Sequence, residues 1–408
     1  MSDGPRLEVA EVFRQHAEEY LTKYGASSHQ RRVLRDVQNC RTAVLGGHVE
    51  QCDHCGHQKI AYNSCRNRHC PKCQGPVRAR WMHARAAELL PVPYFHVVFT
   101  LPETFGPLAL QNKTVVYDAL FRAVGETLLE VAANPKRLGA RIGFLAVLHT
   151  WGQNLMHHPH LHCVVPAGGL SSDGAAWVSG REDFFLPVRV LSRVFRGKFI
   201  AFLKQAISRG QLEYHGNLAP LADPTMMERL LDQSVKNDWV VYAKRPFGGP
   251  QAVLKYLARY THRVAISNRR LLQFENGQVT FSWKDYAQGN QQSTMTLDAV
   301  EFLRRFLLHV LPPSFVKIRY YGFMANRCRK QNLARCRTLL GNGPTVTVAE
   351  QTERTEPPAG SHDELPKIRC PMCHEGCMRI IGRLEREEGL TGTARPRPPP
   401  AVPPPDTS

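Results

Sequence analysis

The chain has 408 residues, of which 43% are hydrophobic, so its length allows two or three domains with ordinary globular cores. Its 53 lysines and arginines outnumber 35 acidic residues, and the net charge of +18 favours a polyanionic partner such as DNA. No apolar run reaches the ~20 residues that cross a bilayer, and the N-terminus lacks a basic stretch followed by an apolar core, which argues against membrane and secreted proteins.

The N-terminal part is predicted to be helical around a cysteine-rich module. Hydrophobic spacing predicts helices over 7–23 and 28–43, and a basic helix runs from about 76 to 90 before Pro91. The module between them covers residues 52–73. We expect this part to form a small zinc-binding, DNA-binding domain.

The module contains two Cys-x-x-Cys knuckles, Cys52–Cys55 and Cys70–Cys73. In a reducing cytoplasm such close cysteines indicate metal binding, and four thiolates close a structural zinc site with no open position. We therefore expect Cys52, Cys55, Cys70 and Cys73 to hold structural Zn²⁺. Five nearby residues could replace a ligand or form a second site: Cys40, His54, His57, Cys65 and His69. For the two cysteines among them, the favoured interpretation is that they are small buried hydrophobes.

The middle of the chain is predicted to mix strands and helices. Asn276-Gly277 is typical of a hairpin turn between short strands within 264–284. Strands are expected at 94–100, 142–151, 160–166 and 239–243. Helices are expected near 111–133, 190–208, from about 250, 296–309 and 326–340. This pattern predicts an α+β body.

The sequence His-Pro-His-Leu-His at 158–162 precedes an apolar, β-branched run and is predicted to lie on a strand. Because side chains alternate across a strand, His160 and His162 should project from one face about 7 Å apart. Two imidazoles at this spacing can bind one metal ion. The alternative is a pair of histidines on a solvent-facing strand edge.

A helix around 254–262 is predicted to carry two tyrosines, Tyr256 and Tyr260, on one face because they are four residues apart. Packing would explain most such pairs. A phenol can also attack a phosphodiester when a metal ion polarises the phosphate, which gives a covalent phosphotyrosine. Phosphate contacts are expected from six basic residues in these two regions: Arg66, Arg68, Lys72, Lys255, Arg259 and Arg263.

Three blocks occur in one order: Cys-Arg-Asn-Arg-His-Cys-Pro-Lys-Cys-Gln, His-Pro-His-Leu-His, and Tyr-Leu-Ala-Arg-Tyr-Thr-His-Arg-Val-Ala-Ile-Ser-Asn. Over about residues 10–340 the chain resembles the rolling-circle transposases of the insertion-sequence-ninety-one type, within the His-hydrophobe-His (HUH) endonuclease superfamily. The resemblance implies cleavage and transfer of single-stranded DNA between element ends and a target. It also implies a 5′-phosphotyrosine intermediate and a 3′-OH that the host replication machinery extends.

The same resemblance assigns the metal pair to His160 and His162 and the two nucleophiles to Tyr256 and Tyr260. HUH nucleases usually have a third ligand on the preceding strand, for which His149 is the first candidate and Gln153 the second. With oxygen ligands from a DNA phosphate, such a site suits Mg²⁺ or Mn²⁺, although imidazoles alone would also accept zinc.

The C-terminal part is expected to hold a linker at 341–366, a possible second zinc cluster at 367–388 and a disordered Pro-rich tail at 389–408. In the cluster, Cys370, Cys373 and Cys377 supply part of a site that His362 or His374 could complete.

The expected fold is α+β, with an antiparallel sheet of about five strands, His160 and His162 on a central strand, and helices over one face. A zinc-binding domain at 1–92 would precede this nuclease domain at 93–340. The expected function is transposition of DNA in the bacterial cytoplasm, at the nucleoid. One alternative is a plasmid replication initiator or relaxase with the same chemistry, and another is a non-catalytic, zinc-dependent DNA-binding regulator.

Overall fold

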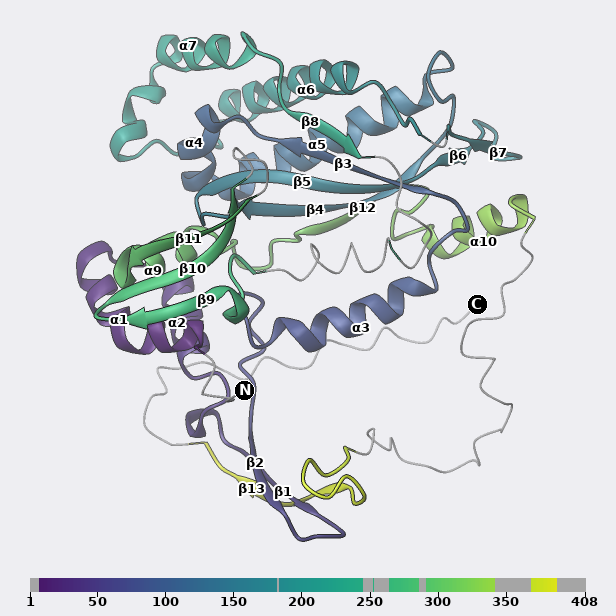
Figure 1. Cartoon of the computed structure of the whole chain (residues 1–408). Helices are drawn as coiled ribbons and strands as arrows, with labels where there is room; N and C mark the ends of the chain where they lie inside the picture. The colour runs from purple at the N-terminus through teal and green to yellow at the C-terminus, as the bar shows by residue number, and fades with distance from the viewer. Residues whose placement is uncertain are drawn as a thin grey trace. The chain divides into compact units, whose positions relative to one another are not determined.

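The computed structural model describes residues 7–181, 183–244, 252, 264–285, 291–341 and 368–386 (Figure 1). The chain divides into two compact units, one made of Met1–Gln38 with Arg66–Glu356 and the other of Asn39–Cys65 with Pro357–Ser408. This division differs from the expected boundary at residue 92. The predicted tyrosine helix, most of the linker and the Pro-rich tail lie outside the described residues.

The larger unit is built on a five-stranded sheet in which every neighbouring pair is antiparallel, as predicted. The strand order is β12-β4-β5-β3-β8, so the histidine strand β5 is central. The strands are β3 (Tyr94–Thr100), β4 (Gly143–Trp151), β5 (His157–Pro166), β8 (Val241–Lys244) and β12 (Ile318–Gly322).

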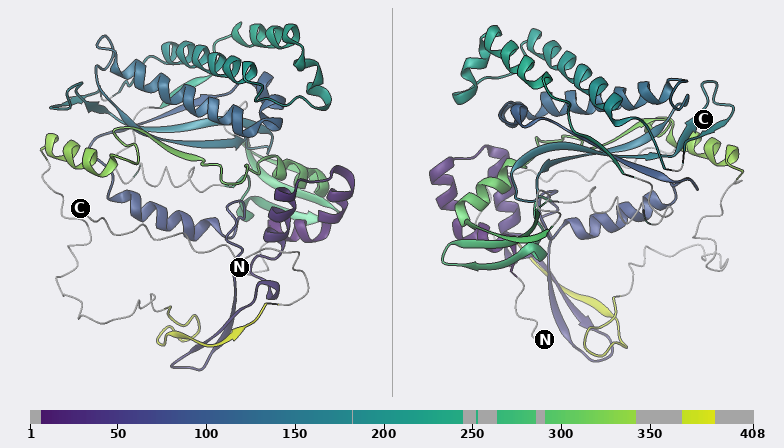
Figure 2. Two further views of the ribbon diagram at one scale, coloured as in Figure 1. Left: turned by 180° about the vertical axis from the view of Figure 1, so that it is seen from behind. Right: turned by 45° about the horizontal axis from the view of Figure 1, so that its top comes forward.

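Two long helices, α5 (Lys113–Ala133) and α6 (Val188–Ser208), cover one face of this sheet (Figures 1 and 2). Alternate strand residues point into this core, among them Phe99 of β3 and Leu161 of β5, and they pack with aromatic residues of the helices. Phe99 meets Phe195 of α6 edge to face at 5.2 Å. Complete burial of such rings supplies much of the hydrophobic stabilisation of the sheet.

The opposite face of the sheet has a smaller apolar cluster beside a polar end. Tyr94, Leu145, Val147 and Val164 pack there with Trp81 of helix α3 (Gln74–Ala86). The strand residues on this face have the opposite parity to those of the main core, as the pleat requires. Toward one end of the strands the apolar side chains give way to histidines.

The first two helices pack with the last part of the larger unit and do not form a domain with the cysteine module. Phe13 of α1 (Val9–Tyr24) meets Phe306 of α9 (Ala299–Leu308) edge to face at 5.0 Å, and the Val9 backbone N–H donates to Asn268 Oδ1. Beside them lie helix α2 (Ser28–Gln38) and a meander of β9 (Leu271–Glu275), β10 (Gln278–Asp285) and β11 (Gln291–Asp298).

The smaller unit holds a three-stranded sheet of order β13-β1-β2, made of β1 (Gly47–Cys52), β2 (Gln58–Tyr62) and β13 (Met378–Leu384). Both neighbours pair antiparallel with β1. A strand near the C-terminus therefore pairs directly with one near the N-terminus. This pairing was not predicted, because it depends on a contact between segments more than 300 residues apart.

Several elements differ from the prediction. Residues expected to begin a helix at 296 instead complete strand β11, and the helix begins only at Ala299. Strand β12 and helix α7 (Pro224–Val235) were not predicted, whereas the Asn276-Gly277 hairpin turn is confirmed by positive φ at both residues. Among the described residues, no helix is both long and apolar enough to span a membrane.

The remaining elements are η1 (Ala43–Leu45), η2 (Glu103–Phe105), α4 (Gly106–Gln111), β6 (Gly168–Leu170), β7 (Trp177–Ser179), η3 (Gly216–Ala222), η4 (Asn268–Arg270) and α10 (Arg329–Leu339).

Candidate functional site

Three histidines meet on the polar end of the sheet. His149 of β4 lies directly opposite His160 of β5 in the antiparallel register, so both side chains point to the same face. His162 lies two residues further along β5 and shares that face. The strand pairing thus brings together the two predicted metal ligands and the first candidate for the third.

The three rings lie close enough to share one ion. Their centroids are separated by 4.5 Å for His149 and His162, 4.8 Å for His160 and His162, and 5.5 Å for His149 and His160. One ring nitrogen from each residue falls within 4.8 Å of those of the other two. The rings of His160 and His162 therefore lean toward each other from the spacing of about 7 Å that the strand geometry sets.

Hydrogen bonds orient two of these rings. The Nδ1 atom of His160 lies 2.6 Å from the carbonyl oxygen of His158, which can only accept, so Nδ1 carries the proton and donates it. The Nδ1 atom of His162 lies 2.8 Å from Nε2 of His96 on β3. Both contacts use Nδ1 and leave Nε2 as the atom suited to bind a metal, an arrangement common at histidine-ligated sites.

Sequence reasoning missed His96. It lies on the neighbouring strand β3, in a register where its side chain reaches the same face as His162. Side-chain alternation along β3 places His96 on one face of the strand. Only the pairing of β3 with β5 shows that this is the face that carries His160 and His162. Its ring stacks on that of His162 at 5.0 Å.

Burial keeps the imidazoles of His160 and His96 neutral. Desolvation lowers the pKa of His160 to about 4 and the pKa of His96 to about 3. A neutral imidazole has a free lone pair, so near pH 7 no proton has to leave before a metal binds. The chemistry of this donor set fits Zn²⁺ as it stands, and Mn²⁺ or Mg²⁺ with added oxygen ligands.

The segment joining β4 and β5 is fixed by a further buried histidine. His309 Nε2 donates to the carbonyl of Leu155 at 3.0 Å, and Leu155 itself has a positive φ of 63°. The second candidate for the third ligand, Gln153, lies in this segment, where its backbone carbonyl accepts from Arg270 at 2.6 Å. His309 thus helps to fix the turn between β4 and β5, the two strands on which His149 and His160 lie opposite each other.

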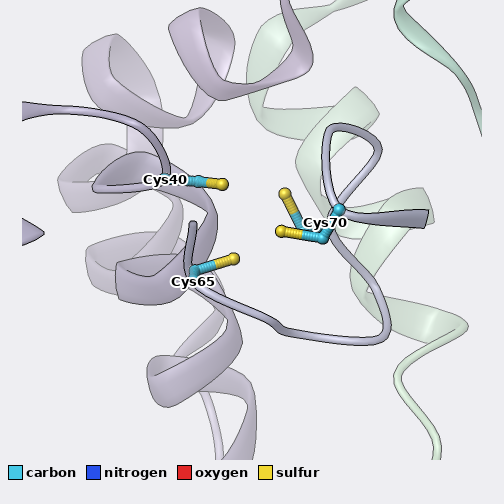
Figure 3. Close-up of side chains that lie close together, drawn as sticks. Cys40, Cys65 and Cys70 are labelled. Carbon is cyan, nitrogen blue, oxygen red and sulfur yellow. The ribbon is translucent and has the colours of Figure 1, made fainter. Parts of the chain in front are cut away.

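The structure divides the four predicted zinc ligands between two groups. Cys70 and Cys73 lie with Cys40 and Cys65, whose sulfurs point into a common space (Figure 3). This grouping favours the alternative interpretation of Cys40 and Cys65, that they join a metal site, over that of small buried hydrophobes. The four sulfurs of this group lie within 4.8 Å of one another.

The other knuckle, Cys52 and Cys55, lies with Cys370 and Cys373. The predicted set of Cys52, Cys55, Cys70 and Cys73 is corrected accordingly. The physical reason is that β1 pairs with β13, which carries the loop of Cys370 to the Cys52 knuckle. Spacing along the chain identifies a knuckle but does not show which knuckle faces it.

The predicted phosphate contacts are only partly accessible. Arg66 is exposed, but Arg68 donates to the carbonyls of Phe315 and Pro312 at 2.6 Å each, and Lys72 forms an ion pair with Glu8. Arg68 and Lys72 thus have structural contacts within the protein. The other predicted residues, Lys255, Arg259, Arg263 and both tyrosines, lie outside the described residues.

Two family models match the chain. One, described as "Transposase zinc-binding domain", matches residues 12–101, and the other, described as "Putative transposase", matches residues 143–332. The two matches include the Cys70 knuckle and the histidine strand. Residues 368–386, which hold the second pair of cysteines, lie outside both.

Two curated relatives match most of the chain. The "Putative transposase y4qJ" of Sinorhizobium fredii (strain NBRC 101917 / NGR234) is 53% identical over 396 residues, covering 96% of this chain and 98% of the relative. The "Transposase for insertion sequence element IS801" of Pseudomonas savastanoi pv. phaseolicola is 31% identical over 356 residues, covering 83% and 82%.

Among solved structures, the metal-bound complex of the conjugative relaxase TrwC with oriT DNA aligns at 15% identity and a TM-score of 0.23. That alignment covers 60% of this chain and 71% of the relaxase chain. The metal-free complex gives 15% identity and a TM-score of 0.22, with 60% and 72% covered.

Proposed function

This chain belongs to the rolling-circle transposases of the insertion-sequence-ninety-one type, and from that premise we propose that it cleaves single-stranded DNA at element ends and transfers it to a target. The observation that carries the proposal is the convergence of His149, His160 and His162 on one face of the central strands. A DNA substrate places the activity in the bacterial cytoplasm, at the nucleoid.

We assign a divalent metal, Mg²⁺ or Mn²⁺, to the Nε2 atoms of His160 and His162 and to a ring nitrogen of His149. When bound, the ion polarises a DNA phosphate and stabilises the charge that develops on it. The protein's own contribution is to hold three imidazoles close together on one sheet face, with His96 and the carbonyl of His158 orienting two of them. Preorganisation of this kind spares the site the cost of ordering its ligands.

The proposed nucleophiles are Tyr256 and Tyr260, on the strength of the sequence motif. The phenol oxygen attacks the phosphorus, a new O–P bond forms, and the bond from phosphorus to the 3′ oxygen breaks. The phenol gives up its proton and the departing 3′ oxygen takes one up. The products are a 5′-phosphotyrosine and a free 3′-OH, which the host replication machinery can extend while the second tyrosine acts on another strand.

The proposed DNA interface combines structural zinc with exposed basic residues. Zinc held by Cys40, Cys65, Cys70 and Cys73 would fix the segment that carries Arg66 and leads into α3. Arg78 and Arg80 are exposed on that helix and are proposed to contact phosphates with Arg66. Lys255, Arg259 and Arg263 are proposed to hold phosphates near the tyrosines.

The test is covalent capture of a 3′-labelled, single-stranded oligonucleotide that spans an element end. The full-length protein with Mn²⁺ should give an adduct on a denaturing gel, and EDTA should abolish it. His160→Ala and His162→Ala should each lower the yield at least 100-fold, whereas His215→Ala, which removes an exposed histidine, should not. Full adduct formation in EDTA would contradict the metal proposal.

Tyrosine variants test the nucleophiles separately. The changes Tyr256→Phe and Tyr260→Phe remove only a hydroxyl, so each single variant should still form one adduct but fail to complete strand transfer. The double variant should form none. If one single variant loses every adduct and the other transfers normally, only one tyrosine is a nucleophile, and an adduct from the double variant would reject the tyrosine mechanism.

A further inference from the structure

Four cysteines of the smaller unit, Cys52, Cys55, Cys370 and Cys373, have their sulfurs within 4.8 Å of one another. The Sγ atoms of Cys52 and Cys373 are 3.7 Å apart, and those of Cys55 and Cys370 are 3.6 Å apart. Four ligands at the usual Zn–S distance of about 2.3 Å in a tetrahedron have sulfurs about 3.8 Å apart. A disulfide would need about 2.05 Å. The observed spacing fits a shared metal ion.

Backbone amides donate to sulfurs of both knuckles. The N–H groups of His54 and Cys55 donate to Cys52 Sγ at 3.4 Å. In the C-terminal knuckle, Met372 donates to Cys370 Sγ and Gly376 donates to Cys373 Sγ, each also at 3.4 Å. Donors aimed at sulfur stabilise the thiolate form, which is the form that binds metal.

The two knuckles are held together by contacts that do not involve sulfur. The Asp53 N–H donates to the Cys377 carbonyl at 3.1 Å, and the Cys377 N–H donates to Asp53 Oδ1 at 2.7 Å. Arg379 Nε donates to the second carboxylate oxygen of Asp53 at 3.0 Å. These contacts continue the β1–β13 pairing up to the sulfurs, so the backbone sets the geometry of the group.

A glycine makes this close approach possible. A Cβ atom at Gly376 would lie 2.5 Å from Cys52 Sγ and 2.6 Å from His54 Cβ, closer than side-chain carbons come to such atoms. Any larger residue at this position would push one knuckle away from the other.

We propose that Cys52, Cys55, Cys370 and Cys373 bind one zinc ion, which makes β1, β2 and β13 a zinc ribbon closed by two segments that are far apart in the sequence. All four positions are filled by protein, so the ion is structural and has no open position for chemistry. The site lies partly outside both matched families and goes beyond the proposed function. It makes residues 368–386 a structural part of the N-terminal cysteine module rather than a separate cluster.

Metal analysis of the full-length protein tests the site. Zinc per chain should fall by one equivalent in the double variant Cys370→Ser/Cys373→Ser. The matched control Cys328→Ser/Cys377→Ser also removes two cysteines. Neither belongs to a group of potential metal ligands among the described residues, so this variant should retain the wild-type zinc content. An unchanged zinc content in the first variant, or iron in place of zinc in the wild type, would overturn the proposal.

Alkylation of the unaltered protein gives a second readout that does not depend on a variant folding. Cys373 and Cys377 are both half-buried and are separated by only three residues. With metal retained, iodoacetamide should modify Cys377 and spare Cys373, and a zinc chelator should remove that difference. Equal labelling of the two before chelation would refute the site. Neither measurement depends on DNA cleavage, so this proposal and the proposed function can fail independently.

Discussion

His96 shows how one residue remote from the sequence motif can control the site. If His162 binds a metal through Nε2, its Nδ1 must keep a proton, and this atom lies 2.8 Å from Nε2 of His96. His96 is buried and its pKa is lowered to about 3, so it stays neutral and can accept that proton in a hydrogen bond. His96 is therefore a positioning residue.

Replacing His96 with Ala should weaken metal binding without removing a ligand. Loss of such an orienting partner typically costs 10- to 100-fold in metal affinity. We expect the Mn²⁺ concentration for half-maximal cleavage to rise by about this factor, with activity largely restored at saturating Mn²⁺. His96→Gln keeps a hydrogen-bond acceptor, so its half-maximal Mn²⁺ concentration should lie between those of His96→Ala and the wild type. A purely structural role would instead lower activity equally at every Mn²⁺ concentration.

At the scale of elements, helix α9 shows why one boundary was predicted incorrectly. Strand β11 ends at Asp298 and the helix begins at the next residue, with no loop between them. The Asp298 carboxylate accepts from the N–H groups of Val300 at 2.9 Å and Glu301 at 3.3 Å. An acceptor at this position satisfies amides that the first turn leaves unpaired.

Replacing Asp298 with Ala should lower the free energy of unfolding by about 0.5–2 kcal/mol, because two amides lose their acceptor. Urea denaturation should detect this as a lower midpoint with an unchanged slope. Asp298→Asn retains a capping oxygen and should cost less. Asp232→Ala, an exposed position in α7, should change stability by less than about 0.5 kcal/mol. A loss at Asp298 no larger than at Asp232 would argue against the cap.

At the scale of the whole molecule, the net charge of +18 predicts DNA binding that is strongly sensitive to salt. The distribution of the charge decides which residues contribute. Arg66 and the α3 residues Arg78 and Arg80 are exposed, whereas Arg68 binds backbone carbonyls. Helix α3 packs on the same sheet face as the histidines, and α6 packs on the opposite face.

Replacing Arg66, Arg78 and Arg80 together with Gln should therefore weaken binding to single-stranded DNA. Each lost phosphate contact should reduce the slope of log affinity against log salt by about 0.7, or about 2 for all three. A matched control replaces three exposed cations of α6, Arg189, Arg193 and Lys204, with Gln. Salt titrations of both triple variants should show the larger change in the first. Equal slopes would mean that net charge alone governs binding.

The sequence by itself determined the features that depend on local pattern. The strand at Tyr94–Thr100, the long helices, the Asn276-Gly277 turn and the α+β class follow from hydrophobic period and turn chemistry, which act between neighbouring residues. The His-x-His pair follows in the same way, because strand alternation fixes the face that His160 and His162 share. The catalytic tyrosines remain a prediction from the motif.

Only the tertiary structure decided which distant segments meet. The β4–β5 register aligns His149 with His160, and the β3–β5 register adds His96. The β1–β13 pairing joins the Cys52 knuckle to Cys370 and Cys373, whereas equal chemistry at every Cys-x-x-Cys made the knuckles indistinguishable in sequence. Strand pairing is set by packing and hydrogen bonding over the whole fold. Local sequence patterns therefore do not predict which strands pair or in which register.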